Sequence, residues 1–198
     1  PCLSKTAVVG FLVTVFWVAA LGTVASETVG EMNLRFEGSE KIADRDHDFT
    51  EVSGLSLARD GGFWAVSDGT ARLFNLDGGG KVLIKSSLDA KPGMEGVALD
   101  VTGGRILAVR EETTEILAIA DDGRVTRHSI LAMDGAGELA PYFSAGDAND
   151  SLEGITVDPQ SGTVFVVKER RPRLLIEIAP DLSRVRRVVP LTSSAGFV

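Results

Sequence analysis

The strongest constraint on the fold of this chain is an internal repeat. One pattern occurs three times, at residues 51–84, 93–131 and 151–191. Each copy holds a short apolar run, a Gly-containing turn, a strongly apolar run (FWAVSD, ILAVRE or VFVVKE), and two further apolar runs separated by another turn. Runs of this length and alternation predict four short β-strands in each copy.

Repeated units of four antiparallel strands are typical of a β-propeller, in which each sheet covers the apolar face of its neighbour. A β-sandwich or an irregular barrel also contains short strands, but neither needs an internal repeat. We therefore predict an all-β fold with about three propeller blades in residues 51–198. Because the smallest propellers have about four blades, we expect the set to be incomplete at its C-terminal end.

The residues before the repeat are predicted to include a linker and one outer strand. Residues 27–50 form this region, and NLRFEGSEKI at residues 33–42 is expected to be the extra N-terminal strand. In a propeller such a strand can complete the last blade and close the ring.

An apolar N-terminal segment at residues 1–26 predicts export from the cytoplasm. It carries no charge between Lys5 and Glu27, and Ala25 fits the position before a signal-peptidase site. The apolar run is also long enough to cross a bilayer as a helix. A cleaved signal peptide and an uncleaved membrane anchor both remain open, whereas a buried core helix fits the one-sided charge less well.

Composition excludes several kinds of partner and site. The chain has 28 acidic and 20 basic residues, a formal net charge of -8, so nucleic acid is not an expected partner. Cys2 is the only cysteine, which excludes an intrachain disulfide and a cysteine-based zinc site. His47 and His128 are the only histidines, and no pattern of catalytic partners surrounds them. We assign no catalytic and no cofactor-binding residues.

Acidic residues recur at corresponding places in the repeat. In a two-strand hairpin, residues that face each other have numbers with a constant sum, and such residues lie on one side of the sheet. The predicted facing pairs are Ser53 with Asp68, Glu95 with Glu111, and Glu153 with Glu169. Opposed like charges destabilise a hairpin, so the repulsion must be offset.

Solvation, hydrogen bonds from backbone N–H groups of the next blade, or a bound cation would each offset this repulsion. The first strand of a blade lines the central channel, so the repeat predicts an oxygen-rich channel mouth of the kind that suits Ca²⁺. The candidate metal ligands are Asp68, Glu95, Glu111, Glu153 and Glu169. Lys168 and Arg170 could instead neutralise Glu169. A solvated or structural role, cation binding and a catalytic role all remain open.

The insertion at residues 132–151 joins the second and third copies. It is rich in Gly, Asp and Ala, and it leads directly into Glu153. We expect a solvated loop near the channel mouth.

The stretches GMEGVALDVTGGRILAVREETTEILAI and SLEGITVDPQSGTVFVVKERRPRLLIEI resemble the SdiA-regulated family, also called the YjiK/CarP-like family. The EG at the start and the KE-x-x-P at the end, here Lys168, Glu169 and Pro172, carry most of the likeness. The resemblance covers residues 33–198, about the first two-thirds of a typical family domain.

This resemblance implies a six-bladed, TolB-like propeller in the bacterial cell envelope. It would be anchored in the plasma membrane facing the periplasm, or periplasmic after signal cleavage. The family has no established reaction, and some members are linked to calcium responses. We therefore expect a binding protein for an unknown small ligand or envelope protein, with Ca²⁺ as the candidate cofactor. The alternative is a metal-dependent phosphoric or carboxylic ester hydrolase, similar to phytase-like and esterase-like propellers.

Overall fold

A computed structural model describes residues 35–42, 44–143, 151–170 and 172–191. The chain divides into two units, Pro1–Gly38 and Ser39–Val198, and of the first unit only residues 35–38 are described. The predicted signal peptide or anchor at residues 1–26 lies outside the described residues. Among those described, no helix has the length and apolarity needed to cross a membrane.

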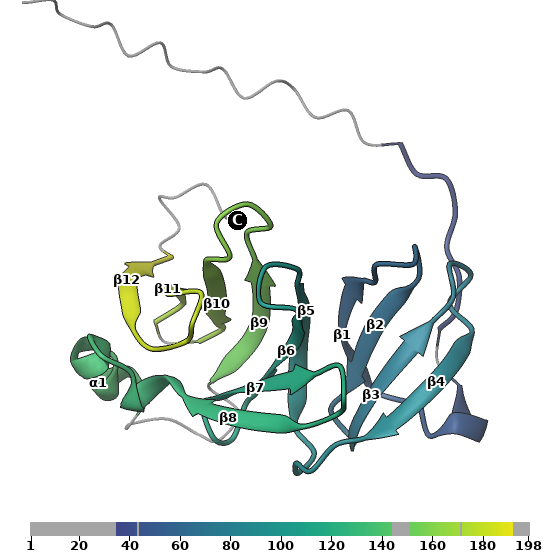
Figure 1. The fold of residues 1–198 in the computed structure, drawn as a ribbon, viewed down its shortest axis with the longest axis horizontal. Coiled ribbons are helices and arrows are strands. Elements are labelled where there is room, and N and C mark those ends of the chain that lie inside the picture. The colour runs from purple at the N-terminus through teal and green to yellow at the C-terminus, as the bar shows by residue number, and fades with distance from the viewer. Residues whose placement is uncertain (1–34, 43, 144–150, 171, 192–198) are drawn as a thin grey trace, which may run out of the picture. The chain divides into compact units, whose positions relative to one another are not determined.

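Three four-stranded antiparallel sheets follow one another along the chain, which confirms the predicted repeat (Figure 1). In each sheet the strands lie side by side in chain order. The first sheet contains β1 (Val52–Leu57), β2 (Phe63–Ser67), β3 (Thr70–Leu76) and β4 (Val82–Ser87). The second contains β5 (Met94–Asp100), β6 (Arg105–Arg110), β7 (Glu115–Ala120) and β8 (Val125–Ser129). The third contains β9 (Leu152–Val157), β10 (Val164–Lys168), β11 (Leu174–Ile178) and β12 (Val185–Pro190).

The second sheet is apolar on both faces because it packs between the other two. On β6, Ile106 and Ala108 belong to the core shared with the first sheet, whereas Leu107 and Val109 belong to the core shared with the third. Successive side chains of a strand point to opposite faces, so a strand between two cores must be apolar at nearly every position. The run RILAVR has this composition.

The first strands of the three sheets, β1, β5 and β9, lie beside one another. Two glycines make this approach possible. A Cβ atom on Gly54 would lie 2.9 Å from the backbone nitrogen of Val97, and a Cβ on Gly96 would lie 3.0 Å from the Cα of Gly154. Gly54 and Gly96 therefore serve packing between sheets, where a side chain would force the sheets apart.

The segment before the first sheet differs from the prediction of an extra strand over residues 33–42. Its described part, residues 35–42, has no regular secondary structure. A strand requires a ladder of hydrogen bonds, and no described ladder includes these residues. A 3₁₀ helix, η1 (Arg45–His47), follows, and Phe49 then packs against Phe74 with ring centroids 4.4 Å apart.

The insertion after β8 also differs from the predicted solvated loop. Its described part contains the 3₁₀ helices η2 (Ile130–Ala132) and η3 (Ala136–Glu138) and the short helix α1 (Ala140–Phe143). Met133, Ala136 and Leu139 are buried in the core of the third sheet. The backbone of Asp134 forms an isolated parallel β-bridge with that of Arg184, next to β12, so this part packs along the third blade. Apolar side chains spaced among the Gly and Asp residues account for the difference.

Candidate functional site

In every sheet, the start of the first strand lies beside the end of the second strand. We call this end of the strands the mouth edge. Here β1, β5 and β9 begin, and β2, β6 and β10 end. The opposite edge, which holds the turns between these strands, is called the turn edge. All five predicted metal ligands lie at the mouth edge, within or directly after these strands: Asp68, Glu95, Glu111, Glu153 and Glu169.

The register corrects the predicted facing pairs. Met94 lies opposite Arg110 and Gly96 opposite Val109, so Glu95 is an extra residue in a β-bulge and does not face Glu111. A bulge places two residues opposite one and turns the side chain of the extra residue.

The same bulge recurs in the other two sheets. Leu152 lies opposite Lys168 and Gly154 opposite Val167, which leaves Glu153 as the extra residue. Ser53 has this place in the first sheet, between Val52 and Gly54. The predictions that Glu153 faces Glu169 and that Ser53 faces Asp68 are therefore also wrong. The constant-sum rule holds only for a ladder without bulges.

Repeated backbone hydrogen bonds fix the main chain of the other three acidic residues. The N–H of Glu111 donates to the carbonyl of Gly93 at 3.1 Å, and the N–H of Glu169 donates to the carbonyl of Ser151 at 3.3 Å. The N–H of Asp68 donates likewise to the carbonyl of Glu51 at 3.2 Å. Each residue after the second strand is thus held beside the start of the first, at the same place in all three sheets.

One further hydrogen bond connects the mouth edges of two blades. The N–H of Gly93 donates to the carbonyl of Asp68 at 2.9 Å, and Gly93 in turn accepts from Glu111. Asp68 of the first blade and Glu111 of the second are therefore joined through one residue.

The electrostatics show that the carboxylates act on one another across blades. Burial raises the pKa of Glu95, and repulsion from Asp68 and Glu153 raises it further, although a hydrogen bond with Ser53 opposes this. Burial also raises the pKa of Glu111, with added repulsion from Glu95, Asp68 and Glu169. These groups come from all three sheets.

Glu153 completes the pattern. Burial raises its pKa, and repulsion from Glu111 and Glu169 adds to the rise. Arg170 lowers the pKa of Glu153 and also that of Glu111. Its guanidinium lies 3.0 Å from the carboxylate of Glu169, so the predicted neutralisation of Glu169 falls to Arg170. One guanidinium only partly offsets five carboxylates.

Lys168, the other predicted neutralising residue, packs beside the ring of Phe143. Its side chain is fully buried, its Nζ donates to the carbonyl of Arg170, and it lies 5.6 Å from the centre of the Phe143 ring. Lys168 is the last residue of β10, and Glu169 directly follows the strand. The pair KE therefore supplies one packed cation and one carboxylate at the mouth edge.

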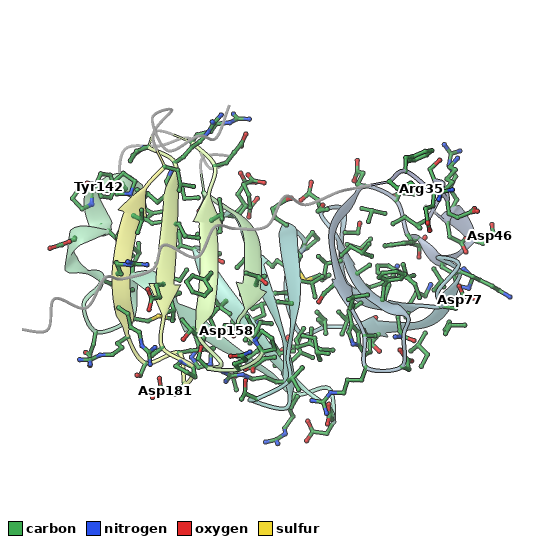
Figure 2. All side chains as sticks on the ribbon, turned by 90° about the horizontal axis from the view of Figure 1, so that it is seen from above. Arg35, Asp46, Asp77, Tyr142, Asp158 and Asp181 are labelled. Atoms are coloured by element: carbon green, nitrogen blue, oxygen red, sulfur yellow. The ribbon has the colours of Figure 1, made fainter. Side chains whose placement is uncertain are left out.

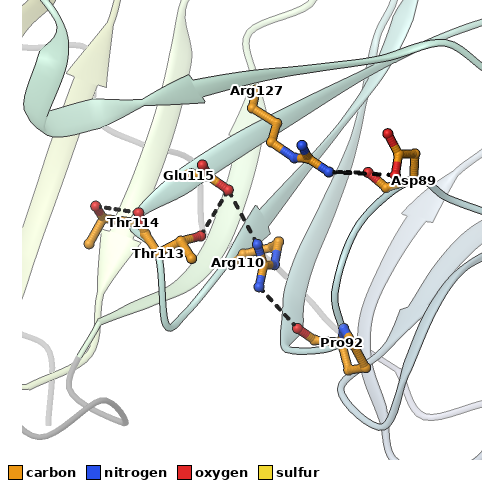
Figure 3. Close-up of polar contacts among 7 residues, drawn as sticks. All are labelled: Asp89, Pro92, Arg110, Thr113, Thr114, Glu115 and Arg127. Carbon is orange, nitrogen blue, oxygen red and sulfur yellow. Dashed lines mark hydrogen bonds and ion pairs between the residues drawn. The ribbon is translucent and has the colours of Figure 1, made fainter.

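Arg110 occupies the same position in the second sheet, and the sequence reading missed it. It is buried, and its guanidinium donates to the carboxylate of Glu115 at 3.2 Å and to the carbonyl of Pro92 at 3.4 Å (Figure 3). Thr113 also donates to Glu115 at 3.0 Å. Arg110 thus fastens the end of β6 to the start of β7 and to the segment before β5, directly behind Glu111.

The cluster is a region of negative charge rather than a preformed coordination site. In the part of the chain that the structure describes, no three acidic, histidine or cysteine side chains are grouped closely enough to hold a metal ion. Neither histidine belongs to the mouth edge. His47 contacts Asp44 at 2.7 Å in the η1 turn, and His128 lies on the outer strand β8.

Solved structures similar to this chain are propeller-like and belong to proteins with different activities. Myxococcus xanthus glutaminyl cyclase is 20% identical with a TM-score of 0.52, covering 72% of this chain and 57% of that one. Virginiamycin B lyase from Staphylococcus aureus is 13% identical with a TM-score of 0.50, covering 73% and 42%. Kuenenia stuttgartiensis hydrazine synthase is 11% identical with a TM-score of 0.52, covering 81% and 40%.

The three sheets and these similarities define the chain as a set of β-propeller blades. It spans about 40 to 57% of the length of these three solved chains. The model of the SdiA-regulated family matches residues 32–192, and the chain belongs to that family. A search among curated proteins found no match.

Proposed function

We propose that this chain is a binding module of the bacterial cell envelope whose mouth edge binds a positively charged ligand, with Ca²⁺ as the first candidate. The supporting observation is the convergence of five carboxylates from three blades on one edge, with raised pKa values at Glu95, Glu111 and Glu153. Burial and mutual repulsion make the charged form of these groups costly. A bound cation would relieve both costs.

Calcium fits the donor chemistry of the cluster. Ca²⁺ takes about six to eight oxygen ligands in flexible geometry, and carboxylates are its common protein ligands. Glu169 and the exposed Asp68 can change rotamer without disturbing the core, and the half-buried glutamates lie on bulges and turns. Binding would then require these side chains to move closer together than they lie in the structure.

Calorimetric titration of the full chain with Ca²⁺, after treatment with a chelator, tests this proposal. We expect one binding event with a Kd of about 10⁻⁴–10⁻³ M, the range of extracellular calcium modules. The double variant Glu95→Gln, Glu153→Gln should bind at least about ten times more weakly. The matched control Asp158→Asn, Asp181→Asn removes two carboxylates from the turn edge and should leave the affinity unchanged.

Two results would overturn the calcium proposal. One is the absence of any heat of binding together with an unchanged melting temperature in Ca²⁺. The other is binding that the Glu95→Gln, Glu153→Gln pair leaves intact. Titration with spermidine in place of Ca²⁺ then distinguishes a site for organic cations from no cation site.

The envelope location rests on residues 1–26, whose sequence predicts a signal or an anchor. Fusion of these residues to a reporter that is active only outside the cytoplasm tests it. The ester-hydrolase alternative has no better support than the binding module. The similar propellers include a lyase and a cyclase, so the fold by itself selects no reaction.

A further inference from the structure

A cavity beside the β6–β7 turn of the second blade is lined by more basic than acidic side chains. Its volume is about 390 Å³, which lies within the range of small-molecule sites. All of its lining residues belong to the second blade or to the connection that leads into it from the first. Its walls therefore come from two blades that already pack together within the chain. The charged and polar lining residues are Asp89, Lys91, Arg110, Thr113, Glu115 and Arg127.

Two of the three basic side chains in this cavity are already paired with acidic residues. Arg110 donates to the carboxylate of Glu115 at 3.2 Å. The guanidinium of Arg127 donates to the carbonyl of Asp89 and lies 4.0 Å from its carboxylate (Figure 3). Lys91 is exposed and has no ion pair or hydrogen bond with any residue that the structure describes. The cavity thus has one positive charge without a partner of opposite sign.

Arg110 contributes a second donor that lacks an acceptor. The residue is 3% exposed, and its buried Nε has no hydrogen-bond partner within the described part of the chain. On the same edge of the guanidinium, Nη2 makes only a long contact of 3.4 Å with the carbonyl of Pro92. A buried donor without an acceptor is destabilising, so this edge of Arg110 requires an acceptor that the described residues do not supply.

The geometry of this edge suits a carboxylate. The Nε and Nη2 atoms of a guanidinium carry two parallel N–H groups, which match the two oxygens of a carboxylate. A carboxylate bound there would satisfy Nε and replace the long contact with Pro92, which is exposed and can turn aside. Glu115 would stay on Nη1 and keep the guanidinium in place, because Thr113 also donates to it at 3.0 Å.

We propose that this cavity binds the carboxylate of a small organic acid, with Arg110 as the bidentate donor and Lys91 as the second cation. The single unpaired charge suits a monovalent carboxylate better than a phosphate dianion. This ligand is opposite in charge to the one proposed for the mouth edge, and the residues that would bind it are different ones. A failed calcium titration therefore leaves this proposal standing.

Titration of the full chain with sodium butyrate, followed by NMR of the backbone amides, tests the proposal. We expect the amides of Lys91 and Thr113 to shift and to saturate, with a Kd of about 1–10 mM, as for a ligand of very few atoms. Butyramide has the same size but no charge, and it should cause no saturable shift. Sodium chloride at equal concentration controls for ionic strength.

Two variants separate the roles of the two cations. Lys91→Gln changes an exposed side chain, so it should leave the circular dichroism spectrum unchanged and weaken butyrate binding about threefold to tenfold. Arg110→Lys keeps the charge but lacks the planar fork, and saturable binding should be lost. The matched control Lys81→Gln removes an exposed lysine between β3 and β4 of the first blade and should leave the Kd unchanged.

Three results would overturn the carboxylate site. The first is the absence of saturable shifts up to about 100 mM butyrate. The second is equal binding of butyramide, which would show that the charge is not recognised. The third is a Kd that Lys91→Gln leaves unchanged, a result that cannot arise from misfolding because this side chain is exposed.

Discussion

Carboxylates lie at both the mouth edge and the turn edge, but their pKa values are shifted in opposite directions. Figure 2 labels Asp158 and Asp181, which lie at the turn edge. Hydrogen bonds from Ser161 and from backbone N–H groups lower the pKa of Asp158, and those from Ser183 lower the pKa of Asp181. At the mouth edge, burial and mutual repulsion raise the pKa of Glu95 and Glu153. The turn carboxylates stabilise the fold, whereas the mouth carboxylates are costly to keep charged.

The two edges also differ in how far apart along the chain the interacting residues lie. Asp158 accepts from Gln160 and Ser161, and Asp181 from Ser183, all within three residues of the acceptor. The groups that raise the pKa of Glu95 come from the first and third blades. Local contacts serve each turn separately, but the mouth edge exists only when the blades are packed together. A functional site is therefore more readily placed at the mouth edge.

The largest loss of stability is expected for a substitution that forces two blades apart. Gly96→Val places a side chain where even a Cβ would lie 3.0 Å from Gly154 and from the nitrogen of Ile155. Overpacking of this kind costs about 2–3 kcal/mol, and we expect the melting temperature to fall by about 5–10 °C. Thermal unfolding followed by circular dichroism measures the change. Gly154→Ala, a control with open space around the new Cβ, should melt within about 1 °C of the unsubstituted chain.

A smaller effect is expected for a buried carboxylate at the turn edge. Asp100 is 1% exposed and accepts from the N–H of Gly103 and from Nε of Arg105, both at 2.8 Å. Asp100→Ala leaves both donors without this acceptor and should cost about 1–3 kcal/mol in urea unfolding. Asp100→Asn keeps an acceptor oxygen and should cost less. Equal losses in the two variants would contradict the role given to these hydrogen bonds.

A substitution at the mouth edge should have the opposite sign. Glu153→Gln removes one of the mutually repelling charges and should stabilise the chain by about 0.5 kcal/mol in the absence of divalent cations. Glu112→Gln, in the exposed turn after β6, serves as the matched control and should change stability by less than about 0.2 kcal/mol. Destabilisation by Glu153→Gln in chelator would mean that the carboxylate is already satisfied within the protein.

The smallest effect is the dependence of stability on pH. Because the folded pKa values of Glu95, Glu111 and Glu153 are raised, the folded state binds protons more tightly than the unfolded chain. Their contribution to stability is full below the ordinary glutamate pKa and is lost as the pH rises through the folded values. The lowered pKa of Asp158 acts in reverse, since its contribution is lost as the pH falls through the folded value.

As the pH is lowered from 7 to 4, the melting temperature of the unsubstituted chain should therefore show a rise that the Glu95→Gln, Glu153→Gln variant lacks. Identical profiles for the two proteins would contradict the raised pKa values.

The sequence was sufficient to predict the blades because local patterns encode them. The turns and apolar runs of each copy specify four strands, and the structure confirms them. The prediction that Glu95 directly faces Glu111 failed because it assumed an uninterrupted ladder. Nothing within one hairpin indicates the bulge, whose glycine neighbour is in contact with the next blade. Arg110 was missed for a related reason: its burial depends on contacts with Glu115 and Pro92 that a run of charged residues does not indicate.

Side-chain carboxyl titration by NMR tests the central claim most directly, since it reads the two edges of one folded molecule in the same experiment. In chelator, Glu95, Glu111 and Glu153 should titrate above the ordinary glutamate pKa, and Asp158 and Asp181 below the ordinary aspartate pKa. Addition of Ca²⁺ should shift the three glutamates downward and leave the aspartates in place. Mouth glutamates that titrate at or below their ordinary pKa would contradict the account.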